Sequence, residues 1–116
     1  MIDLKEVKNN LVKLLDEKKA ENIVEFDISA YKNRLSDWCI IASGTSSRHA
    51  QAVADYAYKY LKEIKLSPRI EGSAKTGWVM IDAGGIELHI FKPDLREYYN
   101  IESLLDGKRP TPELNS

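Results

Sequence analysis

The stretch GWVMIDAGGIELHIFKP, residues 77–93, predicts two short β-strands joined by a glycine turn. Successive side chains of a strand point to opposite faces, and on both sides of the turn they sort into one aliphatic face and one mixed face. A Gly-Gly pair suits the two-residue turn of a β-hairpin, so we place the tip at Gly84 and Gly85. One face of this hairpin is then aliphatic and should belong to the core: Val79, Ile81, Leu88 and Ile90.

The opposite face of the hairpin is mixed. It carries three cross-strand pairs: Trp78 with Phe91, Met80 with His89, and Asp82 with Glu87. Acidic and imidazole side chains are uncommon in a core, whereas aromatic anchors, an adaptable methionine and charges at the rim are typical of docking surfaces. The residues alone leave both interpretations open: a docking surface, or a core face beneath the C-terminal helix, which would bring Tyr98 and Tyr99 with it.

The acidic pair at the tip of the hairpin needs a positive neighbour. Asp82 and Glu87 lie opposite each other, and two like charges in that position are destabilising. The neighbour is a metal ion, an internal lysine or a basic partner. A metal needs further ligands, but His49 and His89 lie far apart in the sequence, and no H-x-x-x-H, C-x-x-C or D-x-D spacing occurs. We therefore expect no metal and no cofactor.

Helical and strand periods alternate along the rest of the chain. The expected elements are a helix at 3–19, a strand at 22–29, a strand at 37–44, a helix at 45–66, a short edge strand at 69–72, the hairpin and a last helix at 93–105. This order predicts an α/β fold, namely a single mixed-sheet domain with flanking helices over residues 1–105. Residues 106–116 have no apolar pattern, so we expect a disordered tail there.

Composition narrows the class of protein. The chain of 116 residues carries 17 basic and 18 acidic residues. It lacks the basic excess of a free-standing nucleic-acid binder, so no sequence-specific nucleic-acid binding is expected. Its charged N-terminus is unlike a signal peptide, and no apolar run approaches the ~20 residues that span a bilayer. We expect a cytoplasmic protein that binds no membrane, with Cys39, inside the apolar run DWCIIAS, as a buried structural thiol.

The segment SGTSSRHAQ, Ser43–Gln51, joins a buried strand to a helix. A glycine and hydroxyl groups at a helix N-terminus suit a bound anion, and Arg48 and His49 add positive charge. The P-loop and dinucleotide patterns are both missing, and a tight turn with Ser46 or Ser47 as N-cap needs the same residue types. The sequence leaves open, as the alternative to a docking protein, a nucleotidyltransferase-like enzyme that uses this turn to bind a nucleotide phosphate.

Four motifs resemble, in their order, the ribosomal silencing factor family, also called Iojap-like: SGTSSRH, W-V-x-I-D, L-H-I-F and R-x-Y-Y. The resemblance runs from about Leu4 to Leu105. It implies a protein that is not an enzyme, with a small mixed α/β fold similar to a nucleotidyltransferase domain but without its metal-binding carboxylates. Family members commonly end the last helix in leucine-tryptophan, where this chain has Leu104 and Leu105. A lost tryptophan would weaken docking at that point.

The resemblance also implies a function and a site. Family members bind the large ribosomal subunit through ribosomal protein L14 and block joining of the small subunit, which lowers translation when nutrients are scarce. That ribosomal protein is basic and would be the positive partner of the acidic pair. The implied ribosomal-protein-binding side chains should point outward, although Phe91 has packing inside as its alternative: Trp78, Met80, Asp82, Glu87, His89, Phe91, Tyr98 and Tyr99. A homodimer through the same apolar face is a further alternative.

Overall fold

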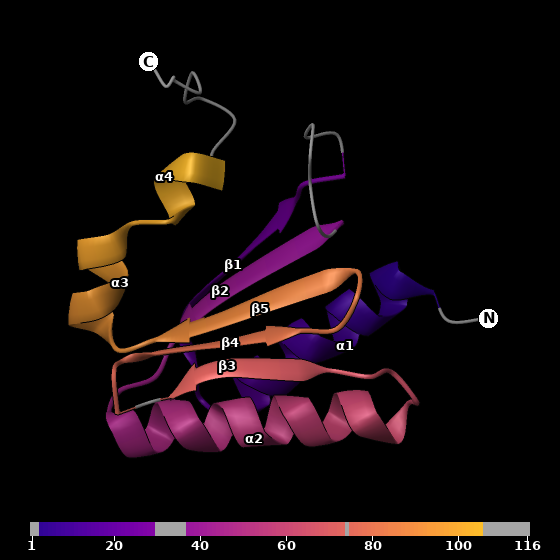
Figure 1. The fold of residues 1–116 in the computed structure, drawn as a ribbon, viewed down its shortest axis with the longest axis horizontal. Coiled ribbons are helices and arrows are strands. Elements are labelled where there is room, and N and C mark those ends of the chain that lie inside the picture. Colours follow the sequence, from indigo (N-terminus) through magenta and orange to yellow (C-terminus); the bar gives the residue numbers. More distant parts are fainter. Residues whose placement is uncertain (1–2, 30–36, 74, 106–116) are drawn as a thin grey trace.

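The computed structural model describes residues 3–29, 37–73 and 75–105 (Figure 1). The expected tail at 106–116 and the segment at 30–36 lie outside these ranges. The elements follow in the order α1 (Leu4–Glu17), β1 (Glu21–Asp27), β2 (Trp38–Ser43), α2 (Ser47–Glu63), β3 (Arg69–Ser73), β4 (Trp78–Asp82), β5 (Ile86–Phe91), α3 (Pro93–Tyr99) and α4 (Glu102–Leu105).

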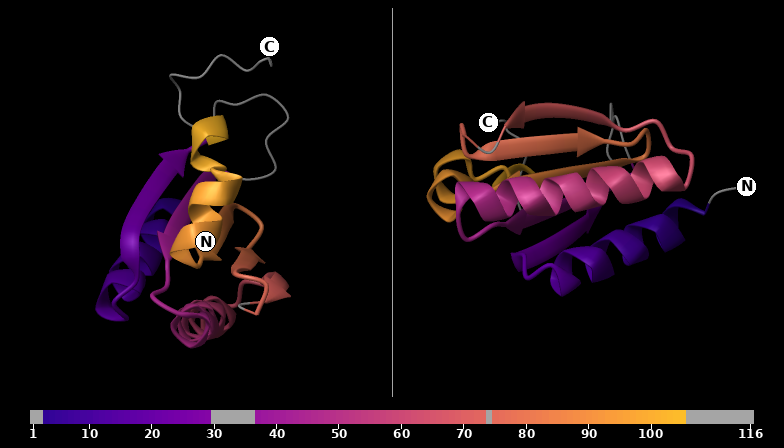
Figure 2. Two further views of the ribbon diagram at one scale, coloured as in Figure 1. Left: turned by 90° about the vertical axis from the view of Figure 1, so that its left-hand side faces the viewer. Right: turned by 90° about the horizontal axis from the view of Figure 1, so that it is seen from below.

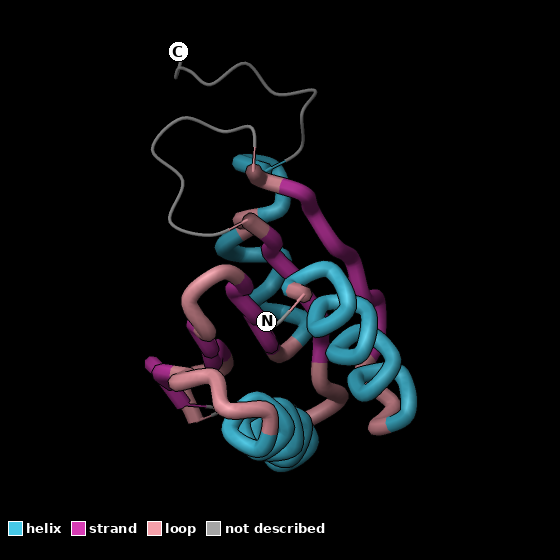
Figure 3. The backbone as a smooth tube through the Cα atoms, turned by 90° about the vertical axis from the view of Figure 1, so that its right-hand side faces the viewer, coloured by secondary structure: helices cyan, strands magenta, loops and turns pink. Residues whose placement is uncertain are grey.

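The five strands form one mixed sheet in the order β1-β2-β5-β4-β3. Strands β2 and β5 pair in parallel, whereas the other three pairs are antiparallel. Helices α1 and α2 lie side by side against one face of the sheet (Figures 2 and 3), and Asn10 of α1 donates a hydrogen bond to the Tyr60 hydroxyl of α2 at 3.1 Å. The expected fold, a single α/β domain with a mixed sheet and flanking helices, is confirmed.

Both large helices begin at a side-chain cap and bury an apolar stripe. The Asp3 carboxylate accepts from the Lys5 N–H, and the Ser46 hydroxyl accepts from the His49 N–H. The stripes pack on the aliphatic face of the hairpin, whose predicted side chains are all buried in this main core: Val79, Ile81, Leu88 and Ile90. Among the described helices, none is long and apolar enough to cross a membrane.

The hairpin has the predicted register. Trp78 pairs with Phe91 and Asp82 with Glu87, and the Ala83 N–H donates to the Ile86 carbonyl at 2.9 Å across the turn. The two turn glycines serve different purposes. Gly84 has a φ of 90°, which favours glycine, whereas a Cβ on Gly85 would lie 2.4 Å from Leu4 Cδ1.

The expected single helix at 93–105 is wrong, because the structure divides it into α3 and α4. Asn100 ends α3 in the left-handed conformation, with φ 47° and ψ 47°, and its N–H donates to the Arg96 carbonyl. Asparagine tolerates this conformation better than most residues and therefore serves as a helix stop. The chain therefore leaves its helical path after α3. Helix α3 lies on the face of the sheet opposite α1 and α2 (Figure 2).

Candidate functional site

The mixed face of the hairpin is partly covered by the protein itself. Trp78 and Met80 are half-buried, but His89 is only 6% exposed and Phe91 is 0% exposed. The expectation that His89 points outward is therefore wrong, and Phe91 takes its alternative place inside. The physical reason is a second, smaller core on this face, in which Phe91 packs with side chains of the sheet and of the segment after β5: Ile28, Cys39, Ile41, Trp78, Leu95 and Ile101.

Aromatic rings are layered from this second core outward. Phe91 lies innermost, and Trp78 stacks on it with 5.0 Å between ring centroids and 24° between planes. Tyr99 of α3 lies 4.8 Å from Trp78, and Tyr98 meets Tyr99 edge-on at 5.1 Å. Tyr99 is 47% and Tyr98 78% exposed. Four of the predicted site residues are thus brought together, and the two tyrosines form the outer layer.

Gly77 allows α3 to approach this close to the sheet. A Cβ at Gly77 would lie 2.0 Å from Leu95 Cδ1, and the residue has a φ of 91°. A larger residue would be strained at this φ, and the Leu95 side chain would have to move to make room for its Cβ. The sequence contained this signal as the glycine before β4, although its purpose becomes visible only once α3 is in place.

A hollow of about 280 Å³ lies beside the outer aromatic rings. We call it the Trp78 groove, and it is lined by residues of β3, β4, the turn between them and α3: Glu71, Gly72, Thr76, Trp78, Met80 and Tyr99. Sequence reasoning missed the β3 and turn residues. They enter the site because β3 pairs with β4, which sets Glu71 opposite Met80 and Ser73 opposite Trp78.

The two acidic residues of the hairpin have separate partners within the protein. Asp82 accepts a hydrogen bond from the Gly84 N–H at 2.9 Å and one from the Arg69 guanidinium at 3.0 Å. These contacts, the backbone one first, lower the pKa of the Asp82 carboxyl. Glu87 Oε1 lies 3.3 Å from His89 Nε2. Of the three positive neighbours left open for Asp82, the structure shows an internal one, although it is Arg69 on the edge strand and not a lysine.

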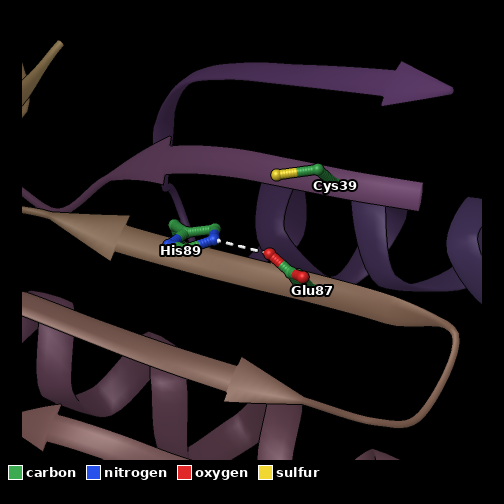
Figure 4. A group of neighbouring side chains, drawn as sticks. All are labelled: Cys39, Glu87 and His89. Atoms are coloured by element: carbon green, nitrogen blue, oxygen red, sulfur yellow. Dashed lines mark hydrogen bonds and ion pairs between the residues drawn. The ribbon is translucent and has the colours of Figure 1, made fainter. Parts of the chain in front are cut away.

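Cys39, Glu87 and His89 form the group that most resembles a metal site in the described part of the chain. Their possible ligand atoms lie within 4.8 Å of one another (Figure 4). The neighbourhood follows from the parallel register, which sets Cys39 beside Glu87, and sequence spacing alone gave no sign of it. Burial first, and then the Glu87 carboxylate, raise the pKa of the Cys39 thiol to about 12, so the thiolate that binds metals is disfavoured.

The hydrogen bonds of His89 also argue against a metal. The Trp78 indole N–H lies 3.1 Å from His89 Nδ1, and because an indole can only donate, Nδ1 must accept. The proton of the neutral ring is therefore on Nε2, facing Glu87. A metal on Nε2 would force that proton onto Nδ1, against the indole N–H. These residues fit a hydrogen-bonded chain better than a ligand set.

The Ser43–Gln51 turn is closed by its own side chains. The Thr45 N–H donates to His49 Nδ1 at 2.9 Å, and His49 Nε2 lies 2.8 Å from the Lys18 carbonyl. With Ser46 as the N-cap, these contacts already engage the Ser46 hydroxyl and both nitrogens of His49, which an anion site would use. A Cβ on Gly44 would lie 2.6 Å from the backbone of Ala50, so this glycine permits close packing. The contacts favour the capping interpretation.

The chain forms a small α/β domain with an aromatic groove on one face of its sheet. A sequence model of the family described as "Ribosomal silencing factor during starvation" matches residues 2–115. A ribosomal silencing factor of Halalkalibacterium halodurans is 36% identical over 104 residues, which cover 89% of this chain and 87% of that protein. A crystal structure of a Chromobacterium violaceum protein has a TM-score of 0.85 at 32% identity, covering 94% of this chain and 91% of that one.

The chain belongs to the ribosomal silencing factor family, which is not a known class of enzyme, and the resemblance seen in the sequence is confirmed. The match also spans the segment expected to be a tail. A mouse protein named for mitochondrial assembly of the ribosomal large subunit is 34% identical over 98 residues, which cover 81% of this chain and 42% of that protein.

Proposed function

We propose that this protein is a non-enzymatic, cytoplasmic repressor of translation. It binds the large ribosomal subunit through ribosomal protein L14 and, by occupying that surface, blocks joining of the small subunit when nutrients are scarce. Membership of the ribosomal silencing factor family supports this proposal. The observation that carries it in this chain is the Trp78 groove, with Tyr99 at its wall and Tyr98 beside it, left open on the face that α1 and α2 do not cover.

Two tyrosines of α3 are the exposed large aromatic side chains at this surface. Aromatic side chains bury roughly 150–250 Å² each. Tyr98 and Tyr99 expose 78% and 47% of their area, so covering both removes about 250 Å² from water and contributes on the order of 6 kcal/mol of gross association energy. Loss of translational and side-chain freedom offsets much of this energy. Phe91, which is fully buried, contributes to docking only by supporting Trp78.

Charge complementarity with a basic partner involves Glu71 more directly than Asp82. Glu71 is exposed at the rim of the groove, whereas the carboxylate of Asp82 already contacts Arg69. A lysine or arginine of the partner can lie over the ring of Trp78 or Tyr99, with Glu71 as its counter-ion. Such rim charges favour the choice of partner and the rate of association.

Two tyrosines of nearly equal exposure provide a matched test of the surface. Tyr99, 47% exposed, lies on the proposed surface, and Tyr56, 49% exposed, lies on α2. We expect Tyr99→Ala to weaken co-sedimentation with purified large subunits by about tenfold, as loss of a central aromatic anchor does. Tyr56→Ala should bind like the unmodified protein.

The possible outcomes of this binding test distinguish an error in the docking surface from an error in the proposed function. If Tyr99→Ala folds normally and pellets with large subunits as the unmodified protein does, the Trp78 groove is not the docking surface. If the unmodified protein fails to pellet with large subunits at micromolar concentration, the proposed function itself is wrong.

A further inference from the structure

His89 is a buried polar side chain that a docking surface does not explain. It is 6% exposed, and its ring lies among aromatic neighbours, with Trp78 at 5.9 Å and Phe91 at 6.3 Å between centroids. Both of its nitrogens nevertheless have partners, Trp78 Nε1 at 3.1 Å and Glu87 Oε1 at 3.3 Å. A polar group held in this way in a small core specifies one arrangement of its neighbours.

The three side chains form a directed chain of hydrogen bonds. Glu87, whose carboxylate accepts, fixes the proton of the neutral imidazole on Nε2. Nδ1 is then free of a proton and accepts from the indole N–H of Trp78, which can only donate. Because these residues lie on the adjacent strands β4 and β5, with Met80 opposite His89, the register of the hairpin sets the geometry of the chain. Figure 4 shows the part of it that joins Glu87 and His89.

We propose that His89 is a positioning residue, which holds the Trp78 indole in the one orientation that forms the wall of the groove. This inference rests on the proposed function and deepens it, since it assigns His89 a role behind the docking surface instead of on it. An indole turned by 180° about its Cβ–Cγ bond would keep nearly the same ring plane over Phe91 but would turn its N–H away from His89. The hydrogen bond to His89 therefore selects between two orientations that stacking on Phe91 does not distinguish.

The hydrogen bond can be observed directly in the free protein. In a ¹⁵N-labelled sample we expect a scalar coupling across the bond between Trp78 Nε1 and His89 Nδ1, with the Trp38 indole signal assigned by Trp38→Phe. The absence of this coupling, with the Trp78 indole N–H exchanging with water as fast as an exposed one, overturns the proposal without any ribosome present.

Two substitutions at His89 separate positioning from simple filling of space. His89→Asn retains an acceptor, because the asparagine amide oxygen lies the same number of bonds from the backbone as Nδ1, whereas His89→Leu fills space without an acceptor. We expect His89→Leu to shift the Trp78 indole signal and weaken large-subunit binding by about tenfold. His89→Asn should keep binding within about threefold of the unmodified protein.

Each possible result supports or overturns the positioning role of His89. Equal binding by folded His89→Leu and His89→Asn, whether both are strong or both weak, overturns the positioning role. If His89→Leu does not fold, the coupling in the unmodified protein and the binding of His89→Asn still test it. Failure of the unmodified protein to bind large subunits removes the proposed function, while the spectroscopic result continues to show whether His89 holds the indole.

Discussion

Phe91 and Tyr99 carry rings of similar size close together in the chain, yet Phe91 is fully buried and Tyr99 is half exposed. Strand alternation places Phe91 on the mixed face beside Trp78, and this was predictable from the sequence. Whether that face was open or covered was not predictable, because its cover depends on how closely α3 approaches. Gly77 leaves room for the Leu95 side chain of α3, and this effect depends on two elements together.

The burial of Cys39 was predictable from its neighbours in the sequence, since an apolar run on both sides of a cysteine indicates a central, covered strand. Cys39 is indeed 1% exposed. Its proximity to Glu87 and His89 was not predictable, because the three residues meet only through the parallel pairing of β2 and β5, which are far apart in sequence.

The Cys39 thiol should be nearly unreactive in the folded protein. Its pKa is raised to about 12, so only on the order of one molecule in ten thousand carries a thiolate at pH 8. We expect labelling by iodoacetamide in native buffer to be at least ~100-fold slower than in denaturant, where the thiol returns to an ordinary pKa near 8.5. Mass spectrometry of quenched samples measures both rates, and rapid native labelling would show that this second core opens readily.

Elements differ in how much of their geometry the sequence determines. The hairpin register was predictable because the glycine turn and the alternation of side chains independently give the same pairing. The division of the C-terminal helix into α3 and α4 was not predictable, because the apolar pattern continues through Asn100, whereas the backbone there turns left-handed. The pairing of β3 with β4, which supplies part of the groove, cannot be read from β3 itself, because this short strand is mostly exposed and has no buried face that would set its register.

Arg96 holds the last two helices to the sheet. Its side chain is 11% exposed and donates to both oxygens of Glu102 on α4, at 2.7 and 3.1 Å, and to the Ser43 hydroxyl at the end of β2, at 2.8 Å. A planar guanidinium can make all three bonds at once, which a lysine cannot. The elements α3, α4 and β2 are thereby joined at one residue.

Removal of this arginine should lower the free energy of unfolding. We expect Arg96→Ala to cost about 1–3 kcal/mol, because it leaves buried Ser43 and partly buried Glu102 without these bonds. Arg48→Ala, at an exposed arginine in the first turn of α2, should change stability by less than ~0.5 kcal/mol. Urea unfolding of the two variants measures the difference, and equal stabilities would mean that the Arg96 contacts contribute nothing.

The whole molecule has two unlike sides. Helices α1 and α2 seal one face of the sheet with the main core, and α3 covers only part of the other face (Figure 2). The order of elements in the sequence predicted an α/β domain but not this asymmetry, because it depends on which face each helix crosses. The less covered face carries the Trp78 groove, and this is the surface that we propose for docking.

The central claim is that this surface, once docked on the large subunit, excludes the small subunit. Its most direct test mixes purified large and small subunits with and without saturating protein and measures whole-ribosome formation by sedimentation. We predict that the unmodified protein and Tyr56→Ala lower the yield of whole ribosomes strongly, and that Tyr99→Ala lowers it much less at the same concentration. An unchanged yield in the presence of large-subunit-bound protein would contradict the claim.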